Sequence, residues 1–157
     1  MHFFCTIIGK FFEHHINKDF ANFDKNNKEN EGKMENLYLK WVNYKTNKKY
    51  VLGALCRDKE NNKYYFKLNE DYLNKAKEAG FLTAILPFTD VNKIYESDTL
   101  FSMFKIRVPN IDNYNEEDIE ALLEEVGLDE FDEFEFLKKT KGILMTDHFI
   151  LEEDRDK

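Results

Sequence analysis

The chain is poor in cysteine, proline and glycine, and each shortage excludes a class of protein. Its two cysteines, Cys5 and Cys56, lie far apart and supply neither a disulfide framework nor a metal-binding spacing. A reducing, cytoplasmic setting is therefore the default expectation. The six glycines are scattered without a G-x-G-x-x-G or G-K-S/T pattern, which excludes the common phosphate-binding loops. No apolar run approaches the roughly 18–20 residues that span a bilayer, so no membrane partner is expected.

Recognisable catalytic and metal-binding constellations are also missing. The four histidines show no H-x3-H spacing, and the adjacent His14 and His15 would point to different sides of a helix or strand. The candidate nucleophiles Cys56, Ser97 and Ser102 lie in neither a G-x-S-x-G elbow nor a Cys–His signature. Ser97 is better interpreted as a helix cap. We therefore expect no enzyme, no cofactor and no metal site.

What the chain does contain is charge, and it is distributed unevenly. The net charge at pH 7 is −8. Residues 1–33 are neutral, residues 34–111 carry a net charge of +4, and residues 112–157 carry −12. The acidic third repels phosphate backbones, so no direct nucleic-acid binding is expected. Residues 34–111, with their positive net charge, could still contact a polyanion. The alternative interpretation is that these charges only keep the surface of the protein soluble.

Residues 1–33 look separate from the rest of the chain. The stretch 20–33 has little periodicity and reads as a linker, so 1–33 is interpreted as an N-terminal extension. An alternative is that Met34 is the native start. If the extension belongs to the protein, its apolar residues fit a short amphipathic element that docks on the core: Phe3, Ile7, Ile8, Phe11 and Phe12.

From residue 34 to residue 151 the pattern predicts a single α+β domain. Three period-two segments, 37–45, 50–57 and 63–68, are separated by short polar turns and indicate an antiparallel meander. Gly53 in the middle strand suggests a bulge or a close backbone approach. The 15 phenylalanines and eight tyrosines provide enough bulky side chains for a core.

Four short helices and a closing strand are predicted after the meander. The helices begin after capping residues or end before Gly or Pro. The closing strand follows Gly142, and a polar tail is expected after it. The predicted ranges are 70–80, 98–108, 115–126 and 132–140 for the helices, 143–151 for the strand and 152–157 for the tail.

The stretch from Gly80 to Pro109 is the most apolar part of the chain and contains both prolines. Its aromatic and aliphatic side chains are expected to supply much of the core, with Leu86 and Ile106 among them. Three of its residues are predicted to form an exposed edge that binds a partner: Tyr95, Lys105 and Arg107.

Several motifs of residues 37–150 resemble the N-terminal domain of HipA-type serine/threonine kinase toxins. VLGALCRDKENNKYYFKLNEDYL (51–73) is similar to the family's V-G-x-L and Y-x-F-x-Y segments, and Leu86-Pro87-Phe88 to its L-P-L. GLDEFDEFEFLKKTKG (127–142) is similar to its D-P-F-x-L-L helix. A further match to its Y-x-S-x-x-L-x-x-F-F-x-N-x-L-P motif is carried by Tyr95, Ser97, Leu100, Phe101, Phe104 and Pro109.

The chain departs from that family at several positions. Ile106 replaces an asparagine, and Pro109-Asn110-Ile111 replaces Pro-Glu-Gly. No kinase core follows before Lys157, so the resemblance implies a stand-alone version of the domain. In the family this domain is an antiparallel sheet with flanking helices that carries no catalytic residue and packs against a kinase core.

The expected function is that of a non-enzymatic protein-interaction module. The resemblance implies a regulatory, antitoxin-like partner of a HipA-like kinase, with the kinase core or a helix-turn-helix antitoxin as its binding partner. The alternative is a phage or mobile-element protein that blocks a host protein through its acidic C-terminal surface. A third possibility is an unrecognised hydrolase, which would need Asp, Glu or His side chains clustered in a pocket.

Overall fold

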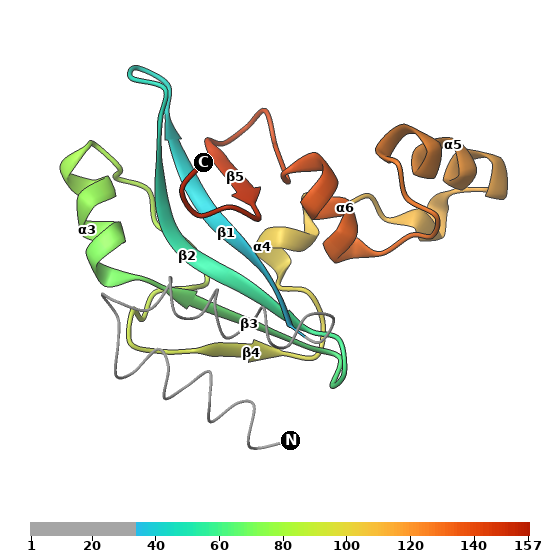
Figure 1. Cartoon of the computed structure of the whole chain (residues 1–157), viewed down its shortest axis with the longest axis horizontal. Helices are drawn as coiled ribbons and strands as arrows, with labels where there is room; N and C mark the ends of the chain where they lie inside the picture. The colour runs from blue at the N-terminus through green and yellow to red at the C-terminus, as the bar shows by residue number, and fades with distance from the viewer. Residues whose placement is uncertain (1–33) are drawn as a thin grey trace.

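The computed structural model describes residues 34–157 and shows an α+β fold built on a five-stranded antiparallel sheet (Figure 1). The strand order is β4-β3-β2-β1-β5. The strands are β1 (Met34–Asn43), β2 (Lys48–Asp58), β3 (Lys63–Leu68), β4 (Tyr95–Ser97) and β5 (Phe149–Glu152). The predicted fold class is confirmed. The predictions for residues 1–33, including the linker and the amphipathic element, lie outside the described residues.

The three-strand meander follows the alternation of apolar residues in the sequence. β1 pairs with β2, and β2 with β3, in antiparallel registers joined by tight turns. Asn47 and Asn62 adopt the left-handed conformation in these turns, with φ of 57° and 53°. Asparagine tolerates this conformation better than most residues, which is why the polar turns form here.

Gly53 lies where β2 is bulged. Leu39 pairs with Gly53 but Lys40 pairs with Val51, so one extra residue of β2 is accommodated at this point. A Cβ at Gly53 would lie 2.4 Å from the backbone oxygen of Lys67 on β3. Both the predicted bulge and the predicted close backbone approach are therefore confirmed at this glycine.

The helices begin where the sequence offers capping side chains. Asn69, Asn115 and Asp132 each accept a hydrogen bond from a backbone N–H of the first turn. α5 ends at Gly127, whose φ of 76° is the left-handed conformation expected after a helix. The helices are α3 (Glu70–Glu78), α4 (Ser102–Lys105), α5 (Glu116–Val126) and α6 (Glu133–Thr140), with a short 3-10 turn η1 (Ile111–Asn113).

The region around residues 83–108 differs from its prediction. The expected helix over 98–108 is reduced to the four residues of α4, and its N-cap is Phe101, without a side-chain hydrogen bond. The reason lies just before it, because Ser97 is not a helix cap but the end of β4, where it pairs with Tyr64 in extended conformation. β4 was not predicted, and residues 83–88 form no strand.

The closing strand is shorter than predicted and includes Glu152, which was expected in the polar tail. Glu152 is 8% exposed and pairs with Tyr38 of β1. Burial by itself would raise the pKa of its carboxyl, but hydrogen bonds from Lys49 and Lys141 and the nearby charge of Lys40 lower the pKa to about 2. These three lysines hold an acidic residue at the end of a buried strand.

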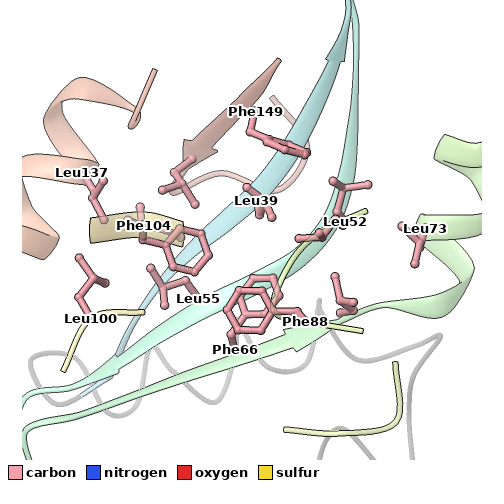
Figure 2. Packing of buried hydrophobic residues seen from close by; sticks show 14 of the residues in the cluster. Leu39, Leu52, Leu55, Phe66, Leu73, Phe88, Leu100, Phe104, Leu137 and Phe149 are labelled. Carbon is pink, nitrogen blue, oxygen red and sulfur yellow. The ribbon is translucent and has the colours of Figure 1, made fainter. Parts of the chain in front are cut away.

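The main core lies between one face of the sheet and helices α3, α4 and α6 (Figure 2). Leu39, Leu55 and Phe66 point from the strands toward Phe104 and Leu137. The predicted contribution of the Gly80–Pro109 stretch is confirmed for its buried members, Phe81, Ile85, Phe88, Leu100 and Phe104. Leu86 and Ile106, also expected in the core, are 66% and 67% exposed because the chain turns at both positions.

The opposite face of the sheet carries a second, smaller apolar cluster. It is formed by Met34, Tyr38, Ala54, Cys56 and Tyr65, all buried. The two clusters alternate along the strands because successive side chains of a strand point to opposite faces. Among residues 34–157, no helix is long and apolar enough to cross a membrane.

Candidate interaction site

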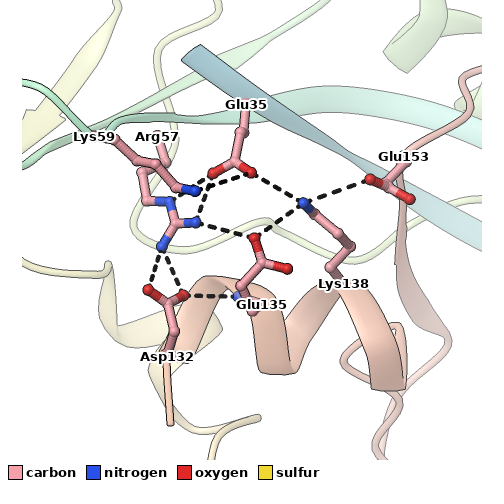
Figure 3. Close-up of polar contacts among 7 residues, drawn as sticks. All are labelled: Glu35, Arg57, Lys59, Asp132, Glu135, Lys138 and Glu153. Carbon is pink, nitrogen blue, oxygen red and sulfur yellow. Dashed lines mark hydrogen bonds and ion pairs between the residues drawn. The ribbon is translucent and has the colours of Figure 1, made fainter. Parts of the chain in front are cut away.

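Arg57, near the end of β2, is the centre of a charge network that fastens α6 to the sheet (Figure 3). Its Nε and Nη2 donate to Oε2 of Glu35 on β1 at 2.9 and 2.5 Å. Its Nη1 donates to the carboxylate of Asp132 at 2.6 Å. Asp132 also caps α6, so the same carboxylate starts the helix and holds it against the sheet.

Two further contacts complete this network. The guanidinium of Arg57 lies 4.6 Å from the ring centroid of Phe134, a favourable cation–π arrangement. Lys138 lies 3.0 Å from Glu35 and 3.1 Å from Glu135, next to Arg57 (Figure 3). A buried guanidinium is stable only when its charge and donors are matched in this way.

The network is suited to structure rather than to proton transfer. Burial raises the pKa of the Glu35 carboxyl, but hydrogen bonds from Arg57 and Lys138 outweigh this effect and lower its pKa below the usual value. A carboxylate with a lowered pKa is a weak proton acceptor, and because it stays ionised at neutral pH it has no proton to donate. The arrangement therefore holds α6 and the segment before it in a defined position.

A cleft of about 540 Å³ lies beside the network, between the segment after α4 and the start of α6. Its lining is mixed: apolar side chains, the cation of Lys105 and three carboxylates. Lys105 Nζ is 3.9 Å from Glu133 Oε1, a solvent-exposed ion pair. The lining residues are Tyr64, Lys105, Val108–Asp112 and Phe131–Glu133.

α5 follows this cleft in the chain and lies at the end of the molecule opposite α3 (Figure 1). α5 contains no fully buried residue. The core face of the sheet is already filled by side chains of α3, α4 and α6. Four apolar side chains therefore form a half-buried stripe on α5: Ile119, Leu122, Leu123 and Val126.

Acidic residues surround this stripe. Residues 111–132 contain ten Asp and Glu and no Lys or Arg, and no basic residue occurs between Arg107 and Lys138. Three of the acids, Glu116, Glu117 and Asp118, occupy the first turn of α5, where they are favourable for the helix dipole. We call the apolar stripe of α5 and the acids of residues 111–132 the acidic helix surface.

The predicted partner-binding residues do not form one exposed edge. Lys105 is exposed and lines the cleft. Tyr95 is half-buried, and its hydroxyl oxygen accepts hydrogen bonds from the backbone N–H groups of Thr89 and Asp90 at 3.1 and 3.0 Å. It therefore holds a loop, whereas its role toward a partner stays a prediction.

The expectation that Arg107 lies on an exposed edge is wrong. Its side chain is 1% exposed and forms an ion pair with Asp147. It also donates a hydrogen bond of 2.7 Å to the backbone oxygen of Gly142. Arg107 is buried because the loop between α6 and β5 lies over it and supplies both partners.

Sequence reasoning named an acidic C-terminal surface in the alternative function but missed the apolar stripe of α5 as part of a site, although a signal was present. An amphipathic helix next to a filled core can leave its apolar stripe exposed, and the unbroken run of acids marks the same segment. The Arg57 network gave no such signal, because Glu35, Arg57 and Asp132 are far apart in the sequence and meet only after folding.

Metal-ligating side chains and one free thiol occur among the described residues. In residues 34–157, no group of three or more His, Cys, Asp or Glu side chains is arranged to hold a metal ion. Cys56 is buried, and this burial, with the charges of Asp58 and Glu35, raises the pKa of its thiol. A thiol that stays protonated is a weak nucleophile.

Comparisons with protein-family models, with curated proteins and with solved structures found no match for this chain.

Proposed function

We propose that this protein is a non-enzymatic interaction module that binds a partner protein through the acidic helix surface. One observation carries the proposal: α5 presents four apolar side chains at helical spacing, none of them buried, inside a segment that has ten acids and no base. An apolar stripe that its own domain covers only in part is a typical docking element for another protein.

The chemistry of this surface defines the partner. The apolar stripe favours a groove or helix that buries Ile119, Leu122, Leu123 and Val126. The acids around it favour a partner with Lys and Arg at the rim, because opposite charges accelerate encounter and like charges exclude other proteins. The partner therefore has an apolar centre and a basic rim.

The first partner to test is a HipA-like kinase core, or the helix-turn-helix antitoxin of such a system. Its motivation is the resemblance of residues 37–150 to the N-terminal domain that packs against such kinases. The function would then be regulatory and antitoxin-like, with no chemistry of its own. Lys105, at the cleft next to α5, is a candidate peripheral contact in the same complex.

The second candidate is a protein that blocks a host protein by presenting an acidic surface. The unbroken acidity of residues 111–132 favours it, since such a surface competes for basic binding sites. Both candidates use the same surface and differ in the identity of the partner.

The test is affinity capture of the tagged full-length chain from its native cells, followed by quantitative mass spectrometry. The variant Leu122→Glu keeps a good helix former but places a charge in the apolar stripe. We expect it to lose the partner at least tenfold, since burial of a carboxylate in an apolar contact is costly. Leu82→Glu is the matched control, because Leu82 is 93% exposed and lies outside the surface.

The purified pair then allows direct measurement. Affinity by calorimetry should fall as the salt concentration rises from 50 to 500 mM, because charged rims are screened. A captured protein with kinase motifs whose activity falls on binding supports the antitoxin-like role. Identical capture by the parent chain, Leu122→Glu and Leu82→Glu contradicts the proposed surface.

A further inference from the structure

The two connections that carry α5 also line the cleft beside the Arg57 network. Residues 108–112 belong to the connection from α4 to α5, and residues 131–133 lead from α5 into α6 (Figure 1). Tyr64 of β3 and Lys105 of α4 complete the lining. A group bound in this cleft would therefore contact the chain both before and after α5.

Negative charge is in excess in the cleft. Its lining has three carboxylates, those of Asp112, Asp132 and Glu133, and the single cation of Lys105. Asp132 is matched by Arg57 at 2.6 Å, but the Asp112 carboxylate forms no ion pair with any of residues 34–157. Glu133 has only Lys105 at 3.9 Å, and the side chain of Lys105 is 60% exposed, so another cation can take its place. Asp112 and Glu133 are therefore available to a cationic group of another molecule.

Two aromatic rings lie in the same lining as these carboxylates. Phe131 and Tyr64 are both half-buried, so part of each ring is accessible. Phe131 also packs on Phe136, with ring centroids 6.1 Å apart, which limits the positions that its ring can take. An aromatic ring beside a carboxylate is a typical surface for a guanidinium, which stacks on the ring and donates parallel hydrogen bonds to the carboxylate.

We propose that this cleft binds a guanidinium group that an arginine of the partner protein presents. A guanidinium matches both parts of the lining, because it has a flat face for the rings and a fork of donors for the carboxylates. A lysine ammonium is a point charge without a flat face, so it matches the carboxylates alone. The cleft volume of about 540 Å³ lies within the roughly 300–1,000 Å³ of ligand pockets, which leaves room for the arginine and its neighbours in the partner.

This inference deepens the proposed function and rests on it for the source of the guanidinium. The acidic helix surface defines a partner with an apolar centre and a basic rim, and the cleft gives one rim residue its identity and its position. An arginine bound there would also hold α5 in one orientation, because it contacts both connections of that helix. A free small molecule with a guanidinium group is the other possible source.

Binding to the cleft can be measured without the partner. The probe is N-acetyl-arginine amide, titrated into the isotope-labelled full chain and followed by the NMR shifts of the cleft residues. N-acetyl-citrulline amide is the matched probe, because it has nearly the same shape without the charge. We expect saturable shifts with the arginine probe and a dissociation constant about tenfold higher for the citrulline probe.

A pair of double variants locates the binding. The cleft variant is Asp112→Asn with Glu133→Gln, which removes both available carboxylates and keeps the side-chain shapes. The control variant is Asp129→Asn with Glu130→Gln, the same two changes at exposed residues outside the lining. We expect about tenfold weaker binding of the arginine probe by the cleft variant and less than a twofold change in the control.

Two results would overturn the cleft as a guanidinium site. One is equal affinity of the parent chain for the arginine and citrulline probes, a comparison that stays decisive even if a variant does not fold. The other is an equal effect of the cleft and control variants, each shown to be folded by urea denaturation.

Affinity capture separates this inference from the proposed function. Leu122→Glu lies outside the cleft, so it should lose the partner but keep its affinity for the arginine probe within twofold. The cleft variant should capture about tenfold less partner than the control variant. Equal capture by these two variants, with probe binding lost in the cleft variant, overturns the partner's arginine and assigns the cleft to a free guanidinium compound. Unchanged capture by Leu122→Glu contradicts the acidic helix surface and leaves the probe result standing.

Discussion

At the scale of single residues, buried charges determine how the segments around the sheet are held. Arg57, Arg107 and Glu152 are each less than 10% exposed, and each is paired with opposite charges from distant parts of the chain. Removing one partner of such a pair leaves the other charge buried without compensation. Substitution of these residues is therefore expected to lower the free energy of unfolding more than substitution at most other positions outside the apolar core.

Replacement of Arg107 tests this expectation. Arg107→Met keeps the length of the side chain but removes the ion pair with Asp147 and the hydrogen bond to Gly142. We expect a loss of about 3 kcal/mol in the free energy of unfolding, measured by urea denaturation. Lys105→Met, two residues earlier and exposed, is the control and should change it by less than about 0.5 kcal/mol. Equal effects of the two variants would contradict the structural role of Arg107.

At the scale of elements, the helices fall into two groups. α3, α4 and α6 each bury side chains against the sheet, and α6 is also fastened by Arg57. α5 buries none, although its caps and the acids of its first turn favour helix formation. A helix of 11 residues with little tertiary packing is marginally stable in water.

Hydrogen exchange should separate these groups. We expect the amides of α5 to exchange at least a hundredfold faster than those of β2, because local opening of α5 exposes no buried side chain. The measurement is exchange with mass spectrometry at peptide resolution, with α6 as the internal control for a short but anchored helix. Addition of the captured partner should slow exchange in α5 and leave α6 unchanged. Equal protection of α5 and β2 in the free protein would show that α5 is held by contacts other than those described.

At the scale of the whole molecule, paired carboxylates make stability depend on pH. The pKa of Glu152 is about 2 in the folded protein and near 4.5 without its partners, and the pKa of Glu35 is also lowered. A carboxyl with a lowered folded-state pKa contributes stability that is fully present above its unfolded pKa. This contribution is lost as the pH falls from about 4.5 through about 2.

The variant Glu152→Gln isolates one part of this effect. At pH 7 it should reduce the free energy of unfolding by roughly 2 kcal/mol, since three lysines lose their shared carboxylate. Near pH 2.5 the Glu152 carboxyl of the parent is largely protonated in the unfolded state. The difference in the free energy of unfolding between the parent and Glu152→Gln should therefore be smaller than at pH 7. Urea denaturation at several pH values measures it, with Glu153→Gln, at an exposed neighbour, as the control. A difference that stays constant with pH would contradict the assigned ion pairs.

How much of this architecture could be predicted from the sequence depends on whether the deciding contacts are local. The three strands of the meander, the caps Asn69, Asn115 and Asp132, and the bulge at Gly53 follow from patterns within a few residues. Alternation, capping and glycine placement act over such short distances that the sequence already contains their cause.

The tertiary structure decided the features that depend on distant partners. β4 exists because Tyr95–Ser97 meets the free edge of β3, and that pairing keeps the chain extended just before the expected helix. Arg107 is buried because the loop before β5 supplies Asp147 and Gly142. The stripe of α5 is only half-buried because side chains of α3, α4 and α6 fill the core face, and no local pattern shows which helices pack on that face.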